Sequence, residues 1–281
     1  MNKALGAALA LLSSVWLTAC VPGAFGMRFH ERVDETRPLA ASGSFSLENT
    51  NGSVHVSTWD EPRVRIEATK GAGTREALAA IEVLIESDAD GVRVRAKHPR
   101  GLFGQRNGQV EYEIRVPRGA RVAIRNVNGG VEIRDSGGAL QASTVNGSVE
   151  ASGVTGEFAV STVNGSVGVT VARVASGSRN SARTTNGAVR VTLPRDAAAE
   201  VEAHTVNGGA HCDFELGAGA RVSRRSVEGR IGDGGARVEL RTVNGSAQID
   251  RGLSAAALPA SADRPAAEAG QRPHAEAPAG R

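Results

Sequence analysis

Aromatic side chains are scarce in this chain of 281 residues, which has six Phe, two Trp and one Tyr. A core built on aromatic rings is therefore excluded, and so is an aromatic surface on which nucleic-acid bases stack. The 33 Lys and Arg residues nearly balance the 30 Asp and Glu residues, and no run of five basic residues occurs. Because nucleic-acid binding needs a basic surface, we expect no nucleic-acid partner.

Cysteine is almost absent, and the first of the two cysteines immediately follows an N-terminal leader. Residues 1–3 are a short positive region, residues 4–17 are apolar, and small residues precede Cys20. This order is typical of an export signal. The apolar run is too short for the roughly 20 residues that a membrane-spanning helix needs. We therefore expect an exported chain whose leader is residues 1–19.

The end of the leader resembles the lipobox of bacterial lipoproteins. The resemblance implies that Cys20 receives lipid and holds the mature chain on a membrane surface. Val21 in place of Asp implies the outer membrane if the cell has one. The alternative is an ordinary signal peptide with a chance cysteine. With Cys20 acylated, Cys212 stands alone and no internal disulfide forms.

Glycine is abundant, at 35 residues, and many glycines belong to a repeated Asn-Gly template. The template has two apolar positions, then Thr-Val-Asn-Gly, then two more apolar positions, all alternating at period 2. From Asn128 onward its intervals are 18, 18, 22, 21, 21 and 16 residues if Glu228-Gly229 is counted as one turn. A period near 20 indicates a stacked repeat architecture. The turn asparagines are Asn51, Asn128, Asn146, Asn164, Asn186, Asn207 and Asn244.

Each template predicts two short strands about one turn. Asn-Gly is also a strong hairpin signal, so an array of β-hairpins is one architecture that fits. We favour an all-β fold, a β-solenoid of coils of about 20 residues, because one repeat cannot bury its own apolar face. In a solenoid, the valine before each asparagine is expected to turn inward at the corner. The template threonines are expected to pair across strands. These residues are Val127, Val145, Val163, Val206, Val227 and Val243, with Thr144, Thr162, Thr184, Thr205 and Thr242.

Three segments lie outside this pattern. Residues 20–43 lack clear periodicity and are expected to be a tether. Residues 59–116 interrupt the repeats with strands, a short helix over 74–80 and a hairpin about 88–91, and are expected to form a cap-like segment within the domain of residues 44–250. Residues 251–281 are rich in Ala and Pro, so a disordered tail is predicted.

The segment 44–56, the Trp59-Asp60 pair, the segment 112–117 and the Thr-Val-Asn-Gly units resemble a bacterial family of domains of unknown function named "putative adhesin". The family is similar to the head domain of autotransporter adhesins. The resemblance covers residues 44–250 and implies a right-handed β-helix without established catalytic residues. Glu228 in place of a turn asparagine, and Asn180, Arg224 and Asp233 at inward positions, depart from the pattern. We therefore expect an irregular coil between residues 176 and 235.

The sequence contains few signs of a catalytic or metal-binding site. His204 and His211 lie near Cys212, but neighbouring strand residues point to opposite faces, so no metal site is predicted. Carboxylates are scattered, and no nucleophile motif or phosphate loop occurs in a usable context. Hence we expect no catalytic residue and no cofactor. The loop 100–106 carries two apolar residues between arginines, and either contacts a partner or covers the end of the solenoid.

These observations favour a non-enzymatic lipoprotein of the bacterial cell envelope, held to the membrane through Cys20. Its β-helical domain is expected to bind an envelope or surface protein or a glycan. An envelope-stress sensor or scaffold is the alternative, and a glycan-active β-helix enzyme is a remote one.

Overall fold

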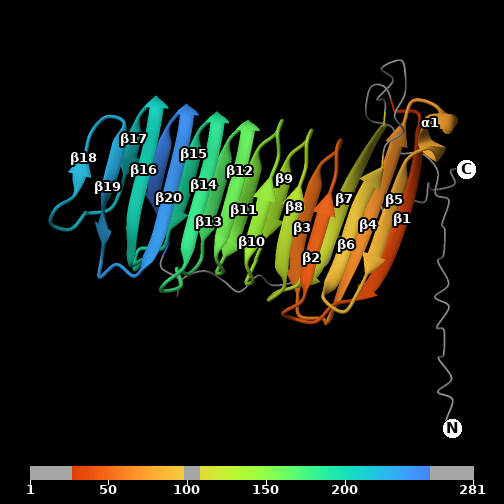
Figure 1. The fold of residues 1–281 in the computed structure, drawn as a ribbon, viewed down its shortest axis with the longest axis horizontal. Helices are drawn as coiled ribbons and strands as arrows, with labels where there is room; N and C mark the ends of the chain where they lie inside the picture. Colours follow the sequence, from red (N-terminus) through yellow and green to blue (C-terminus); the bar gives the residue numbers. More distant parts are fainter. Residues whose placement is uncertain (1–26, 98–107, 254–281) are drawn as a thin grey trace, which may run out of the picture.

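The computed structural model describes residues 27–97 and 108–253. Two β-sheets lie face to face and run the length of an elongated molecule (Figure 1). Each repeat contributes one strand to each sheet, and neighbouring repeats pair in parallel. The prediction of an all-β solenoid is therefore confirmed. The hairpin array is excluded, because hairpin strands would pair antiparallel.

Sheet A has ten strands. In spatial order they are β1 (Phe29–Pro38), β4 (Arg63–Ala72), β7 (Gly108–Pro117), β3 (Val54–Trp59), β9 (Val131–Arg134), β11 (Val149–Val154), β13 (Val167–Val171), β15 (Val189–Leu193), β21 (Ala247–Arg251) and β17 (Ala210–Cys212).

Sheet B has eleven strands. In spatial order they are β18 (Arg221–Val222), β19 (Ser226–Ile231), β16 (Ala199–Asn207), β20 (Ala236–Asn244), β14 (Arg179–Asn186), β12 (Phe158–Asn164), β10 (Leu140–Ser143), β8 (Arg121–Arg125), β2 (Ser44–Glu48), β6 (Gly91–Lys97) and β5 (Glu82–Ser87).

The core fills the space between the two sheets. Parallel pairing in register places Leu140 between Val122 and Phe158, so residues of one template position stack into columns. All three side chains are buried. Burial of apolar surface in each column stabilises the fold by about 25 cal/mol per Å². A single coil could not bury its own apolar face, so several coils must stack.

The turn asparagines stack along one edge of the molecule, and each one after Asn51 donates its side-chain N–H to the side-chain oxygen of the preceding asparagine in the stack. Within this asparagine ladder the Nδ2–Oδ1 distances range from 2.7 to 2.9 Å. In spatial order the ladder contains Asn51, Asn128, Asn146, Asn164, Asn186, Asn244 and Asn207.

The glycine after each asparagine brings neighbouring coils close together. Gly147 has a φ of +149°, and a Cβ placed there would lie 2.3 Å from the carbonyl oxygen of Gly129. The N–H of Gly147 donates to the carbonyl of Asn164 at 2.9 Å. Any larger residue would need both an unfavourable backbone conformation and a wider coil spacing.

The threonines do not pair with one another as expected. The hydroxyl of Thr162 is buried and donates to the carbonyl of Gly147, at 2.8 Å. Equivalent bonds from Thr144, Thr184, Thr205 and Thr242 measure 2.8 to 3.1 Å. A carbonyl exposed by the tight glycine turn is thus the nearer acceptor.

The expectation that the preceding valines turn inward is wrong. Val127, Val145, Val163, Val206 and Val243 are 38 to 46% exposed. Strand alternation continues to the turn, so a buried threonine is followed by an outward valine. Val227 is buried, but for another reason, because it lies in β19.

The order of the coils differs from the order of the sequence. The last repeat, β20 and β21, lies between β14–β15 and β16–β17. The chain reaches it after β19 pairs antiparallel with β16. Glu228 therefore lies within a strand and occupies no repeat turn, and Arg224 and Asp233 are exposed. Asn180 stays buried, where its side chain accepts the N–H of Phe158 at 3.2 Å.

The opposite end is covered by the interrupting segment. β6 and β7 stack in parallel on β2 and β3, while β5 and β4 add antiparallel strands. The helix α1 (Arg75–Ala79) begins after Thr74, whose hydroxyl accepts the N–H of Ala77. Residues 29–38 are not a tether as expected, because they form β1 on β4. Charged residues fill half of the positions of β1, so no apolar period marks it in the sequence.

Gly147→Ala is expected to destabilise the fold by about 1–3 kcal/mol, because the new methyl group meets the Gly129 carbonyl at positive φ. Urea unfolding followed by circular dichroism measures the change. Gly130→Ala is the matched control, since its Cβ would lie 3.6 Å from the nearest atom, and it should cost less than about 0.5 kcal/mol. Equal costs at both positions would contradict this role of the turn glycines.

Candidate functional site

A shallow groove crosses the outer face of sheet B. Its volume is about 380 Å³, and it passes over the first residues of β2, β8, β10 and β12 toward β14. Short outward side chains form the floor, among them Ser46, Ala123 and Ala159. Since large residues at these positions would fill the groove, its shape follows from the small size of these outward side chains.

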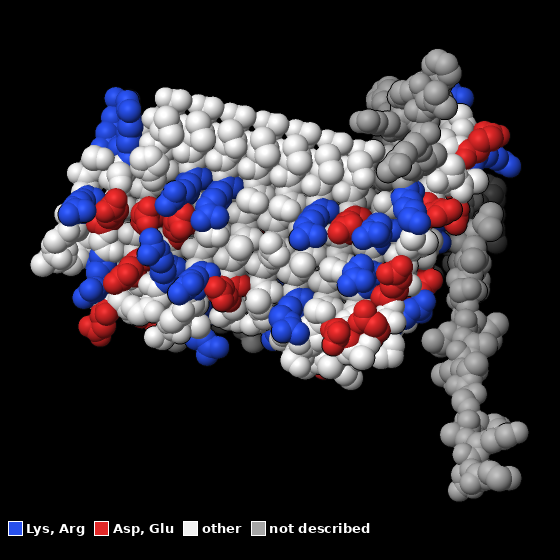
Figure 2. Space-filling model, in the orientation of Figure 1, with Lys and Arg blue, Asp and Glu red and all other residues white. Residues whose placement is uncertain are grey.

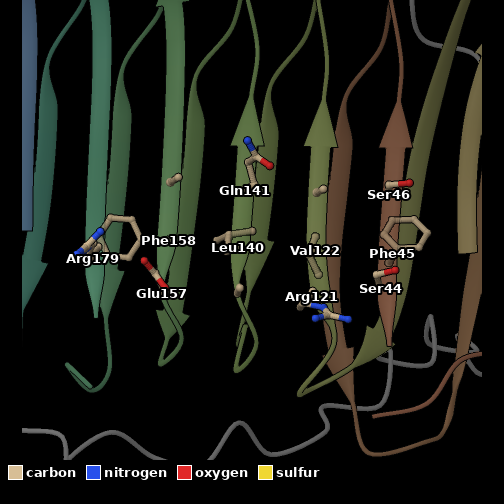
Figure 3. Close-up of a pocket in the computed structure, with 13 residues that line it drawn as sticks. Ser44, Phe45, Ser46, Arg121, Val122, Leu140, Gln141, Glu157, Phe158 and Arg179 are labelled. Carbon is tan, nitrogen blue, oxygen red and sulfur yellow. The ribbon is translucent and has the colours of Figure 1, made fainter. Parts of the chain in front are cut away.

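Three charged side chains line the groove, and Figure 3 labels each of them. Arg121 begins β8, Arg179 begins β14, and Glu157 immediately precedes β12. All three are exposed, and none forms an ion pair with another residue in the described ranges. Two unpaired guanidinium groups near an uncharged floor can bind carboxylate or phosphate groups of a ligand.

Charged side chains elsewhere on this face gather in two regions, with an uncharged area between them (Figure 2). In the first region Glu48 pairs with Arg95 at 2.9 Å and with Arg125 at 3.5 Å. The groove lies next to this region, in which Arg125 is already paired with Glu48.

The second region covers β14, β20 and β16. Glu239 pairs with Arg183 at 2.9 Å and also with Arg241. Glu202 pairs with Arg237 at 2.9 Å and with Arg241 at 3.1 Å. These contacts join the inserted coil to both of its neighbours, so they help to fix its place in the stack.

The hydrogen bond from Arg183 is the main reason why the pKa of Glu239 lies below its ordinary value of 4.5; burial acts in the opposite direction and is weaker. The Glu239 side chain is only 16% exposed, so solvent screens these pairs less than it screens a fully exposed pair. The carboxylate therefore remains charged into the acidic range.

The outer face of sheet A carries a second set of polar residues. His55 and Glu132 approach to 3.1 Å, and Glu132 also binds Arg134, which lowers its pKa. Burial raises the pKa of Glu150, the next residue along the sheet, and Glu132 adds to the effect. No groove accompanies these groups among the described cavities, so sheet B is the stronger candidate.

Cys212 and its neighbours lie at the end of the stack. Cys212 is half-buried against the core, and burial raises its pKa. His211 is exposed on the other face and contacts Asp213 at 2.9 Å. Within residues 27–97 and 108–253, no three His, Cys, Asp or Glu side chains gather as a metal site would require.

The predicted leader, the lipidation site Cys20, residues 20–26 of the predicted tether and the loop 100–106 fall outside the described residues. The predicted tail does so from residue 254 onward. None of the described helices is long and apolar enough to cross a membrane.

Sequence reasoning missed the groove and its arginines. Arg121 and Arg179 lie 58 positions apart in the chain, and only the stacking of coils brings them to the same groove. A comparison of outward side-chain size between coils would have revealed the small residues.

Glu239→Gln is expected to destabilise the protein at neutral pH by about 1 kcal/mol, because two ion pairs are lost. The folded-state pKa of Glu239 is lowered, so its contribution is present above pH 4.5 and is lost as the pH falls through that lowered pKa. Unfolding by urea at neutral and acidic pH should show the difference between variant and wild type closing in acid. Glu157→Gln is the control and should change little, while a constant gap for Glu239→Gln would contradict the assignment.

Comparison with known proteins gives a family and a set of distant structures. No curated protein matches the chain. One similar structure is a "putative cell adhesion protein" from Clostridium sporogenes ATCC 15579, with 14% identity, a TM-score of 0.45 and coverage of 79% of this chain and 100% of the other. Another is a "putative adhesin" from Bacteroides fragilis NCTC 9343, with 12% identity, a TM-score of 0.41 and coverage of 78% and 97%.

The family match is more extensive. Residues 39–250 match the family described as Toastrack DUF4097, and this range includes both sheets except for β1 and the last residue of β21. The chain therefore belongs to the Toastrack DUF4097 family.

Proposed function

We propose that this protein is a non-enzymatic binding module of the bacterial cell envelope, anchored through lipid on Cys20. Its sheet B groove holds an anionic segment of a protein or glycan. The observation that carries the proposal is the position of Arg121 and Arg179, both unpaired among the described residues, beside a floor of small uncharged side chains.

The paired arginines on the same face support this assignment by contrast. Arg125, Arg183, Arg237 and Arg241 each contact a glutamate of the protein. A ligand would have to compete with those glutamates. The groove arginines carry no such competitor except the single carboxylate Glu157, so an incoming anion gains their full hydrogen-bonding capacity.

The carboxylates on this face favour binding over catalysis. Hydrolysis of a glycan generally uses two carboxylates placed on either side of the scissile bond. Glu157 is the one carboxylate among the residues that line the groove. Glu48, Glu202 and Glu239 are held by arginines.

Removing both groove arginines should weaken binding to an acidic ligand by about tenfold or more, because two charge-assisted contacts are lost. The mature chain carrying Cys20→Ala can be tested on immobilised acidic polysaccharides and acidic proteins, with neutral ones as background. Arg121→Ala with Arg179→Ala is compared with Arg224→Ala and Arg225→Ala, which removes the same charge from exposed positions elsewhere. Equal losses in the two double variants, or no binding to any acidic surface, would rule out the groove.

Anchoring is tested separately by metabolic labelling with an alkyne fatty acid. The wild type should incorporate label and sediment with membranes, since two or three acyl chains bind a bilayer stably. Cys20→Ala should lose both properties, whereas Cys212→Ala should keep them. An unlabelled wild type released into the medium would contradict the lipid anchor and leave a secreted binding module.

A further inference from the structure

The asparagine ladder ends at Asn207. Its Nδ2 donates to Oδ1 of Asn244 at 2.9 Å, which is the same kind of bond that joins the other neighbouring asparagines of the ladder. The Oδ1 atoms of the six other ladder asparagines each accept such a bond. No group in the described residues donates to Oδ1 of Asn207, so its side-chain carbonyl is open.

The backbone of the same turn is also different. At six ladder turns the glycine N–H donates to an asparagine carbonyl of the adjacent coil, at 2.8 to 3.0 Å; these glycines are Gly52, Gly129, Gly147, Gly165, Gly187 and Gly245. The N–H of Gly208 has no acceptor among residues 27–97 and 108–253. Gly208 is exposed, whereas the six others are only partly exposed.

We propose that Asn207-Gly208 is a site of spontaneous deamidation, a reaction that the ladder suppresses at its other turns. The backbone nitrogen of Gly208, after losing its proton to solvent base, attacks Cγ of Asn207. The bond from Cγ to Nδ2 breaks and ammonia leaves, which closes a succinimide ring. Water then opens the ring at either carbonyl and gives an aspartate or an isoaspartate at this position.

The two hydrogen bonds that are missing at Asn207 are the ones that restrain the reacting atoms elsewhere. In an internal turn the glycine N–H is held by the neighbouring coil, and the side-chain carbonyl is held by the next asparagine. Both bonds must open before nitrogen and carbon can approach, and such local opening is costly inside a stack. Among the described residues, Asn207 keeps the bond from Nδ2 to Asn244 and the bond that its backbone carbonyl accepts from Gly245, and neither restrains the Gly208 nitrogen or the side-chain carbonyl oxygen of Asn207.

The reaction changes the end of the stack chemically. The product loses the Nδ2 donor and places a negative charge against the acceptor Oδ1 of Asn244. An isoaspartate also lengthens the backbone by one atom, which disturbs the register of β16 with β20. We therefore expect deamidated molecules to show faster hydrogen exchange in β16.

The test incubates the folded, mature protein at 37 °C and mildly alkaline pH, then follows deamidation by tryptic peptide mass spectrometry. Cleavage separates Asn207 in residues 196–221, Asn186 in residues 184–190 and Asn244 in residues 242–251. Asn207 should deamidate about tenfold or more faster than Asn186 and Asn244, because two restraining hydrogen bonds are absent. Asn107-Gly108 lies in another peptide and does not enter this comparison.

The same protein in concentrated urea is the control for intrinsic reactivity. There the ladder is absent, and the three rates should fall within about threefold of one another, because all three sites are Asn-Gly in an open chain. Dividing each folded rate by its unfolded rate isolates the effect of structure. A ratio for Asn207 as low as those for Asn186 and Asn244 would overturn the proposal.

Discussion

The close approach of neighbouring coils at the Asn-Gly turns is the constraint on which the rest of the structure depends. Each turn glycine leaves no space for a side chain against the preceding carbonyl, as Gly147 does against Gly129. That spacing puts the asparagine side chains within hydrogen-bonding distance and lets a buried threonine reach a turn carbonyl. With the turns fixed, the parallel register follows, and the register stacks the apolar columns.

Local pattern is enough to predict the strands and the core of the repeats, since period 2 and Asn-Gly both act over a few residues. Leu140 and Val160 are buried as their template positions require. The order of the coils is not local. All coils share one template, so the apolar columns would allow either β20 or β16 to lie beside β14. The distinguishing contacts are ion pairs such as Glu239 with Arg183, between residues 56 positions apart.

The errors at the turn and at β1 have related causes. A solenoid corner was expected to rotate Val163 inward, but the strand keeps its alternation as far as Val163, which follows buried Thr162 on the outer side. In β1 exposure does alternate along the strand, but many of the side chains are charged and pair with the neighbouring strand β4, as Asp34 does with Arg65. Hydrophobic period therefore detects only strands whose inner face is fully covered.

The same register that builds the core determines which arginines are left for a ligand. Arg125 lies beside Glu48 on the adjacent strand, and the two form an ion pair. Four residues earlier on the same strands, Arg121 lies beside Ser44, which cannot neutralise it. Arg179 lies beside Arg237, which is itself bound to Glu202. Glu157 lines the same groove as Arg179, but no ion pair joins the two among the described residues. Coil register thus determines which arginines of this face are available for the ligand that we propose.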